Sequence, residues 1–181
     1  MIRVQLVTAS SAKTESKALL GQIQQAFGNV PAMFQAVANS PVALKKMWGG
    51  FGALAGGRLQ PKLKEQLAVA IADRNDCEYC LAAHTALGRQ AGASAQEMID
   101  AQSGRSFEPQ TAAALSFALK VVDQRAQLGD EDIAALRRAG FDDETIVEIL
   151  AHVALNLFTN YINVALRVPV DFPAVKLRRF A

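Results

Sequence analysis

The chain has 181 residues, 51% of them hydrophobic, and a formal net charge of +2. This size and composition suffice for one domain with a hydrophobic core, or for one built from two similar halves. The small net charge gives no electrostatic indication of nucleic-acid or membrane binding, and two cysteines cannot form a disulfide framework.

Residues 1–12 are expected to form a loosely held, flexible arm with at most one short strand, and they lack the long apolar segment of a signal peptide. Beyond the arm, apolar residues recur at helical spacing, interrupted by prolines, glycines and capping residues. No stretch alternates as a strand does, and none approaches the ~18 apolar residues of a membrane helix. The chain is therefore expected to be all-α. The expected helices begin near Thr14, Pro31, Pro41, Pro61, Asn75, Ser94, Pro109, Asp130 and Asp142.

Pro169 is expected to stop the last helix, leaving residues 169–181 as an extended, partly apolar tail. Little of the same chain is left to cover such an apolar tail, so we expect the tail to dock on a neighbouring subunit. The whole of 1–181 is then one domain with an arm and a tail.

The helix that begins at Pro61 carries apolar residues on two opposite sides, which indicates burial. Glu65 lies at the centre of the second side. A buried carboxylate there needs a partner. Alternatively, the carboxylate reaches the surface beside Lys62 or Lys64, and periodicity alone leaves both possibilities open.

The next helix holds both cysteines and one of the two histidines: Cys77, Cys80 and His84 share one helical face. Asn75 or Asp76 is positioned to cap its first amides. The partial positive charge and free amides of a helix N-terminus favour a thiolate, and His84 lies one turn beyond Cys80. The spacing favours a redox pair in a reducing cytosol.

Two other interpretations of the cysteine pair remain open. The cysteines could simply pack in the core. They could also bind zinc tetrahedrally, together with His84 and His152, provided His152 meets them across the core. Otherwise His152 is expected to be a packed or capping core histidine.

The chain also contains a faint internal similarity. At one constant offset, Glu65 corresponds to Glu148, Cys77 to Asn160 and Cys80 to Asn163. This hints at two related helical halves, one reactive and one not.

Taken together, Glu65-x11-Cys77-x2-Cys80-x3-His84 resembles the alkylhydroperoxidase D family, within the carboxymuconolactone decarboxylase superfamily. The resemblance is strongest over residues 30–92. It implies an all-α, alkylhydroperoxidase D-like helical bundle and a thiol peroxidase that reduces organic hydroperoxides. It implies a homo-oligomer (dimer, trimer or hexamer), no bound cofactor or metal, and an external dithiol reductant of the lipoyl or thioredoxin-like kind.

By the same resemblance, Cys80 is the peroxidatic cysteine, Cys77 the resolving cysteine and His84 the base for Cys80. Glu65 orients His84 or relays its protons. Where the family can have a further histidine, this chain has Tyr79, a possible replacement in the relay. The alternatives are a dithiol–disulfide oxidoreductase or redox sensor with little peroxidase activity, and a decarboxylase-like relative of unknown substrate.

Overall fold

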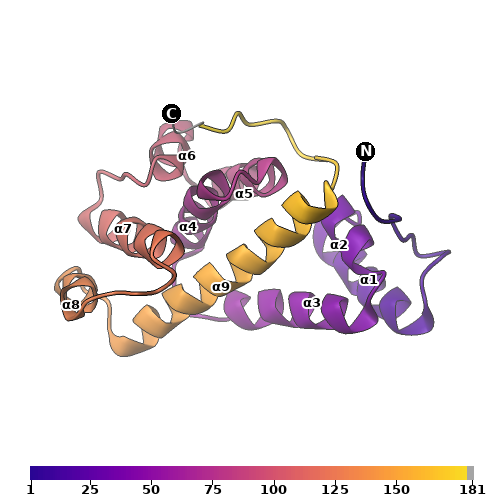
Figure 1. The fold of residues 1–181 in the computed structure, drawn as a ribbon, viewed down its shortest axis with the longest axis horizontal. Coiled ribbons are helices and arrows are strands. Elements are labelled where there is room, and N and C mark those ends of the chain that lie inside the picture. The colour runs from indigo at the N-terminus through magenta and orange to yellow at the C-terminus, as the bar shows by residue number, and fades with distance from the viewer. Residues whose placement is uncertain (179–181) are drawn as a thin grey trace.

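The computed structural model describes residues 1–178, and within them the chain forms nine α-helices and no strand (Figure 1). The all-α prediction is confirmed. The helices are α1 (Thr14–Phe27), α2 (Ala32–Val37), α3 (Pro41–Ala55), α4 (Pro61–Arg74), α5 (Glu78–Gln90), α6 (Ala95–Gln102), α7 (Pro109–Asp123), α8 (Asp130–Arg138) and α9 (Asp143–Leu166).

Local capping explains why most of these helices begin where the sequence predicts. The Ser40 side chain accepts a hydrogen bond from the third amide of α3, and Pro41 follows at the first helical position. Ser94 and Glu97 form a reciprocal capping box at the start of α6. The Asp142 carboxylate caps α9 in the same way as Ser40 caps α3.

Helix α4 lies at the centre of the bundle and contacts α5, α6, α7 and α9. Its two predicted apolar sides are both buried: Leu67 and Ile71 on one side and Val69 and Ala72 on the other have no exposed surface. Because α4 is enclosed by four helices, a side chain that projects from it is held in a defined direction. The Glu65 side chain, which projects from α4, is therefore held in a defined direction.

Helix α9 crosses the whole bundle diagonally (Figure 1) and is the longest helix described. Contrary to the sequence-based expectation, it is long and apolar enough to span a membrane by length and composition alone, with a mean hydropathy of 1.4 in its most apolar window. Its buried face, however, is largely polar. The polar side chains on that face are His152, Asn156, Thr159, Asn160 and Asn163.

The N-terminal arm is more firmly attached than the sequence indicated. The Arg3 amide donates to the carbonyl of Leu166 at 2.9 Å, and the Val7 amide donates to the carbonyl of Gln35 at 3.1 Å. These bonds tie the arm to the end of α9 and to α2, and no strand forms there.

The C-terminal tail also differs from expectation, because it packs on its own chain. We call residues 169–178 the strap; residues 179–181 of the predicted tail lie outside the described part. The strap runs from the end of α9 past α5 to α6 (Figure 1). The backbone amide of Arg178 donates to Asp73, and the Gln102 side chain donates to the carbonyl of Lys176. Phe172, Val175 and Leu177 pack against the core.

One buried carboxylate joins α9 to the α3–α4 connection. Glu148 accepts hydrogen bonds from the backbone amides of Arg58 at 2.7 Å and Leu59 at 3.0 Å. Gly57 makes this approach possible, since a Cβ there would lie 2.2 Å from a Glu148 carboxylate oxygen. Burial disfavours the charged form, but the two amides together with the charges of Lys64 and His152 outweigh it, and the pKa of Glu148 lies below its ordinary value.

We therefore expect Glu148→Ala to lower the free energy of unfolding by about 2–3 kcal/mol, because it leaves two amide donors without an acceptor. The depressed pKa means that the contribution is complete above the unfolded value near 4.5 and is lost as the pH falls below it. Denaturant unfolding at neutral and acidic pH measures both effects. Glu144→Ala, on the exposed side of α9, is the control and should change little; equal losses would contradict the assignment.

Candidate functional site

The candidate site is built at the junction between α4 and α5. Asn75 ends α4, and Asp76 takes a positive φ of 52° that turns the chain. The cap predicted at Asn75 or Asp76 is wrong, because Cys77 itself caps α5. Its sulfur accepts a hydrogen bond from the Cys80 amide at 3.3 Å. Asn75 instead donates to the side chain of Asn160 at 2.9 Å, which fastens the junction to α9.

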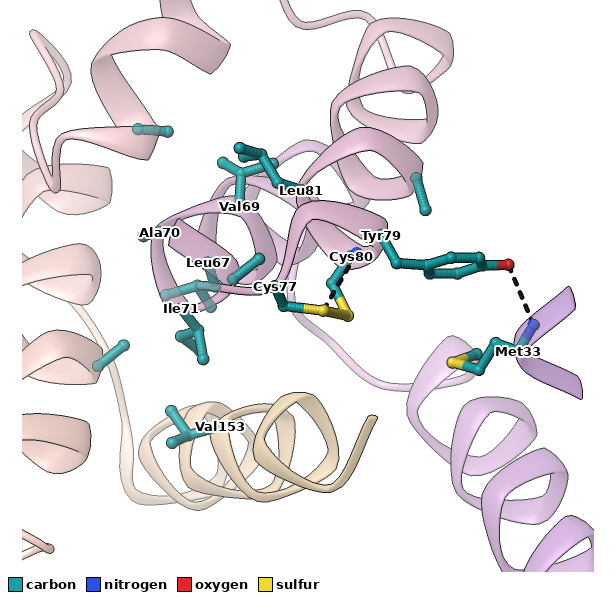
Figure 2. Packing of buried hydrophobic residues seen from close by; sticks show 14 of the residues in the cluster. Met33, Leu67, Val69, Ala70, Ile71, Cys77, Tyr79, Cys80, Leu81 and Val153 are labelled. Atoms are coloured by element: carbon teal, nitrogen blue, oxygen red, sulfur yellow. Dashed lines mark hydrogen bonds between the residues drawn. A yellow bond between two sulfur atoms is a disulfide. The ribbon is translucent and has the colours of Figure 1, made fainter. Parts of the chain in front are cut away.

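Cys77 and Cys80 are joined by a disulfide, with their Cα atoms 5.4 Å apart. Figure 2 shows the bond at the first turn of α5, among the buried side chains of α4 and α5. The two residues are only 1% and 2% exposed. The predicted pair is therefore close enough to interconvert between dithiol and disulfide without rearrangement of the helix.

Glu65 and His84 form the predicted pair between α4 and α5. A Glu65 carboxylate oxygen lies 2.7 Å from Nδ1 of His84, and the two side chains are 21% and 15% exposed. Periodicity left open whether Glu65 is buried with a partner or reaches the surface, and the structure shows that it has a partner. A carboxylate at Nδ1 holds the proton on that nitrogen and leaves Nε2 free to accept or donate a proton.

Asn163 is a contact that sequence reasoning did not assign to the site. Its side-chain amide nitrogen lies 3.1 Å from the sulfur of Cys80 and 3.2 Å from the sulfur of Met33. Asn163 is 3% exposed, so its amide is held in place by packing. The sequence signal for this contact was the recurrence of asparagine at positions 156, 160 and 163, on one face of α9. The pair of residues related by the internal offset, Cys80 and Asn163, thus touch in space.

Cys80 and His84 open onto a common pocket with largely apolar walls. Its lining residues are Phe27, Pro31, Met33, Phe34, Phe51, Tyr79, Cys80, Ala83, His84, Leu87, Thr159, Asn163 and Phe172. The residues come from α1, α2, α3, α5, α9 and the strap, which explains why no sequence motif marks the pocket. Apolar walls with a few convergent polar groups are typical of sites for small organic molecules.

The predicted relay role of Tyr79 is not supported by its geometry. Its hydroxyl accepts a hydrogen bond from the Met33 amide at 3.3 Å, and in Figure 2 the ring points toward Met33 and away from the disulfide. Burial raises the pKa of the Tyr79 phenol well above its ordinary value, and the nearby Asp171 carboxylate adds to the effect. The ring also packs edge-on against Phe172, so Tyr79 anchors the strap.

His152 does not join the cysteines, as a zinc site would require. Its Nε2 lies 3.7 Å from Glu148, and its ring lines a second pocket with Glu65, His84 and Lys64. Burial and the charge of Lys64 lower the pKa of His152. Within residues 1–178, no three His, Cys, Asp or Glu side chains are grouped to hold a metal ion.

The sequence matches a known family over the region that holds this site. Residues 43–124, from α3 to the end of α7, match the carboxymuconolactone decarboxylase family, and this range includes Glu65, Cys77, Cys80 and His84. Over these residues the chain is similar to the carboxymuconolactone decarboxylase family. The family resemblance expected from the sequence is confirmed.

Solved structures show a similar fold over nearly the whole chain. An alkylhydroperoxidase AhpD core, an uncharacterized peroxidase-related protein from Ralstonia eutropha JMP134, has a TM-score of 0.86 and 24% identity, covering 94% of this chain and 92% of that chain. A peroxidase-related protein from Silicibacter sp. TM1040 has a TM-score of 0.81 and 25% identity, covering 93% and 91%. The predicted alkylhydroperoxidase D-like bundle is thus confirmed.

Another protein with a similar fold has a different activity. The debrominase Bmp8, in a cysteine-to-alanine variant bound to 2,3,4-tribromopyrrole, has a TM-score of 0.79 and 20% identity, covering 93% of this chain and 91% of that chain. Comparison with curated protein sequences yields no match. Fold alone therefore does not fix the substrate.

We expect Asn163→Ala to slow alkylation of reduced Cys80 by iodoacetamide at neutral pH about tenfold or more, because a hydrogen bond to the thiolate is lost. The rate follows from mass-spectrometric quantification of the labelled peptide. Asn160→Ala is the matched control, since Asn160 is equally buried on α9 but bonds to Asn75. Equal slowing in both variants would show that Asn163 acts through folding alone.

Proposed function

We propose that this protein is a thiol peroxidase that reduces organic hydroperoxides through Cys80 and Cys77. The observation that carries the proposal is that Cys80, His84 and Asn163 line one apolar pocket. Cys77 is bonded to Cys80, and Glu65 is hydrogen-bonded to His84. This arrangement provides a stabilised thiolate, a proton donor and a second thiol, beside walls suited to an alkyl or aryl group.

In the proposed reaction, the Cys80 thiolate attacks the terminal oxygen of the hydroperoxide and the O–O bond breaks. Cys80 becomes a sulfenic acid, and the departing alkoxide takes the proton held at Nε2 of His84, whose charge Glu65 stabilises. The Cys77 thiol then attacks the sulfenic sulfur, water leaves, and the disulfide forms. No bound cofactor takes part in these steps.

Each turnover then requires a dithiol to reduce the disulfide. A lipoyl group or a thioredoxin-like protein would supply both electrons and both protons. Such a cycle fits a cytoplasmic protein, because the cytosol keeps dithiols reduced. The dithiol–disulfide oxidoreductase alternative uses the same pair without the peroxide step.

The peroxidase proposal predicts distinct effects for three variants in a coupled assay with cumene hydroperoxide and dihydrolipoamide. Cys80→Ser should abolish activity, and Cys77→Ser should stop at one sulfenic acid per chain. Glu65→Gln should lower kcat/KM by about 10²–10⁴-fold, because His84 loses the carboxylate that orients its imidazole for proton transfer. Full activity in both cysteine variants would refute the proposal, and disulfide reduction without peroxide consumption would favour the oxidoreductase.

A second candidate is reductive removal of halogen from an aromatic ring. Its support is the debrominase among the structural neighbours and the aromatic character of the pocket wall, which includes Phe27, Phe34, Phe51 and Phe172. The two thiols would supply two electrons and two protons: one proton replaces the halogen on carbon, and the other leaves with the halide as the disulfide forms. Halide release from a bromopyrrole exceeding peroxide consumption would favour this candidate.

We also propose that the protein is a homo-oligomer joined through α9. Exposed or half-buried apolar residues recur on its outer face at alternating spacings of four and three, which is the pattern of a helix packed against another helix. The members of this α9 stripe are Val147, Ala151, Ala154, Phe158, Tyr161 and Ala165. A second copy of the chain, which presents the same stripe, is the occupant that such self-complementarity favours.

Ala154→Arg should therefore shift the protein from oligomer to monomer in sedimentation velocity at micromolar concentration, because it places a charge at the centre of the stripe. Val42→Arg is the control, since Val42 is 80% exposed on α3 and lies outside the stripe. A monomeric wild-type protein, or an oligomer unchanged by Ala154→Arg, would overturn the proposed interface.

A further inference from the structure

The two cysteines of the disulfide line different hollows in the protein. Cys80, but not Cys77, lines the aromatic pocket that holds His84. Cys77, but not Cys80, lines a depression between the start of α5, the end of α9 and the strap. We call it the strap-side depression. Its lining residues are Asp76, Cys77, Glu78, Tyr79, Asn163, Val164, Arg167, Val168 and Val170.

Disulfide exchange has a geometric requirement that makes this separation important. A thiolate attacks one sulfur from the side opposite the other sulfur, which leaves with the electron pair. A thiol in the strap-side depression meets Cys77, and Cys80 then becomes the leaving group. A thiol in the aromatic pocket would meet Cys80, and Cys77 would leave.

The surroundings of the two sulfurs favour Cys80 as the leaving group. As a thiolate, Cys80 would keep the hydrogen bond from the Asn163 amide, 3.1 Å from its sulfur. It would also share its pocket with the His84 imidazole, which Glu65 stabilises when protonated. The only hydrogen bond to the Cys77 sulfur in the described residues comes from the Cys80 backbone amide. Exchange is faster when the departing thiolate is better stabilised.

The strap-side depression also suits a thiol on a narrow arm better than a thiol on a flat protein surface. Cys77 is only 1% exposed, so the attacking sulfur must reach down to it. Val164 and Val170 provide apolar walls, with Glu78 and Arg167 at the charged margin. Glu78 and Val170 also line a neighbouring depression with Ala174, Val175 and Lys176, so the hollow continues along the strap.

We propose that the reductant, an alkyl dithiol on a slender arm, attacks Cys77 through the strap-side depression, while the oxidising substrate reacts with Cys80 in the aromatic pocket. The first thiolate forms a mixed disulfide with Cys77 and releases Cys80 as a thiolate. The second thiol of the reductant then attacks the mixed disulfide and frees Cys77. The reductant becomes a cyclic disulfide, and both cysteines regain their electrons and protons. Only the reaction of the oxidising substrate with Cys80 rests on the proposed function; the route of reduction through Cys77 does not.

A trapping experiment identifies the attacked sulfur without any peroxide. Oxidised wild-type protein is mixed with 2-mercaptoethanol and excess iodoacetamide, digested and examined by mass spectrometry. We expect the mercaptoethanol adduct on Cys77 and the carbamidomethyl group on Cys80, in about tenfold excess over the reverse pattern. The reverse pattern, or equal amounts of both, would overturn the proposal even if the protein is an active peroxidase.

A steric variant tests the route. Val170→Trp places a large side chain in the strap-side depression and should slow reduction of the disulfide by dihydrolipoamide about tenfold, while single-turnover oxidation of reduced protein stays within about twofold. Val42→Trp, on an exposed site of α3 away from both hollows, should change neither step. If Val170→Trp slows oxidation and leaves reduction unchanged, the assignment of the two sides is wrong. If peroxide does not oxidise the reduced wild-type protein but the trapping pattern is still observed, the peroxidase proposal is refuted and the proposed route of reduction stands.

Discussion

The hydrogen bond between Glu65 and His84 is the interaction on which the site depends. It joins two successive helices at a point where each carries one reactive element, a carboxylate on α4 and an imidazole one turn beyond a cysteine on α5. A partly buried carboxylate would be costly without this partner, and an imidazole without it could adopt either tautomer. The rigid position of α4, enclosed by four helices, keeps the pair in register with Cys80.

Helix α9 adds two polar contacts to the site formed by α4 and α5. Asn160 holds the junction in place through Asn75, and Asn163 reaches the sulfur of Cys80. The same helix fixes the α3–α4 connection through Glu148. Its polar face therefore serves the site, while its apolar outer face remains available. A single hydropathy profile combines these two faces and makes the helix resemble a membrane span.

Much of this organisation is readable from the sequence because it is local. Prolines and capping residues such as Ser40, Ser94 and Asp142 act within one helical turn, so the helix starts follow from nearby residues. Helical periodicity likewise places Cys77, Cys80 and His84 on one face. The Glu65–His84 pair was suggested by the family likeness, because periodicity alone left Glu65 with two possible environments.

The remaining features depend on contacts between distant segments, which periodicity does not report. Asn163 lies 83 residues from Cys80 along the chain, and its polar side chain gives no indication of which neighbour it will meet. The strap was expected to cover another subunit because nothing in the sequence shows that Tyr79 offers Phe172 a packing surface. The Arg3 guanidinium donates to the carbonyl of Ala165, but the backbone amides of Arg3 and Val7 also attach the arm, and backbone hydrogen bonds leave no trace in residue identity.

The order of these segments along the chain has a consequence for biosynthesis. The cysteines emerge from the ribosome well before α9 and the strap, and Asn163, which contacts Cys80, follows it by 83 residues. Until translation ends, both thiols lack the cover that makes them almost inaccessible in the finished protein. Domains acquire long-range contacts only when the distant segment has been made. The nascent polypeptide is thus exposed to premature oxidation, and a reducing environment protects it during this interval.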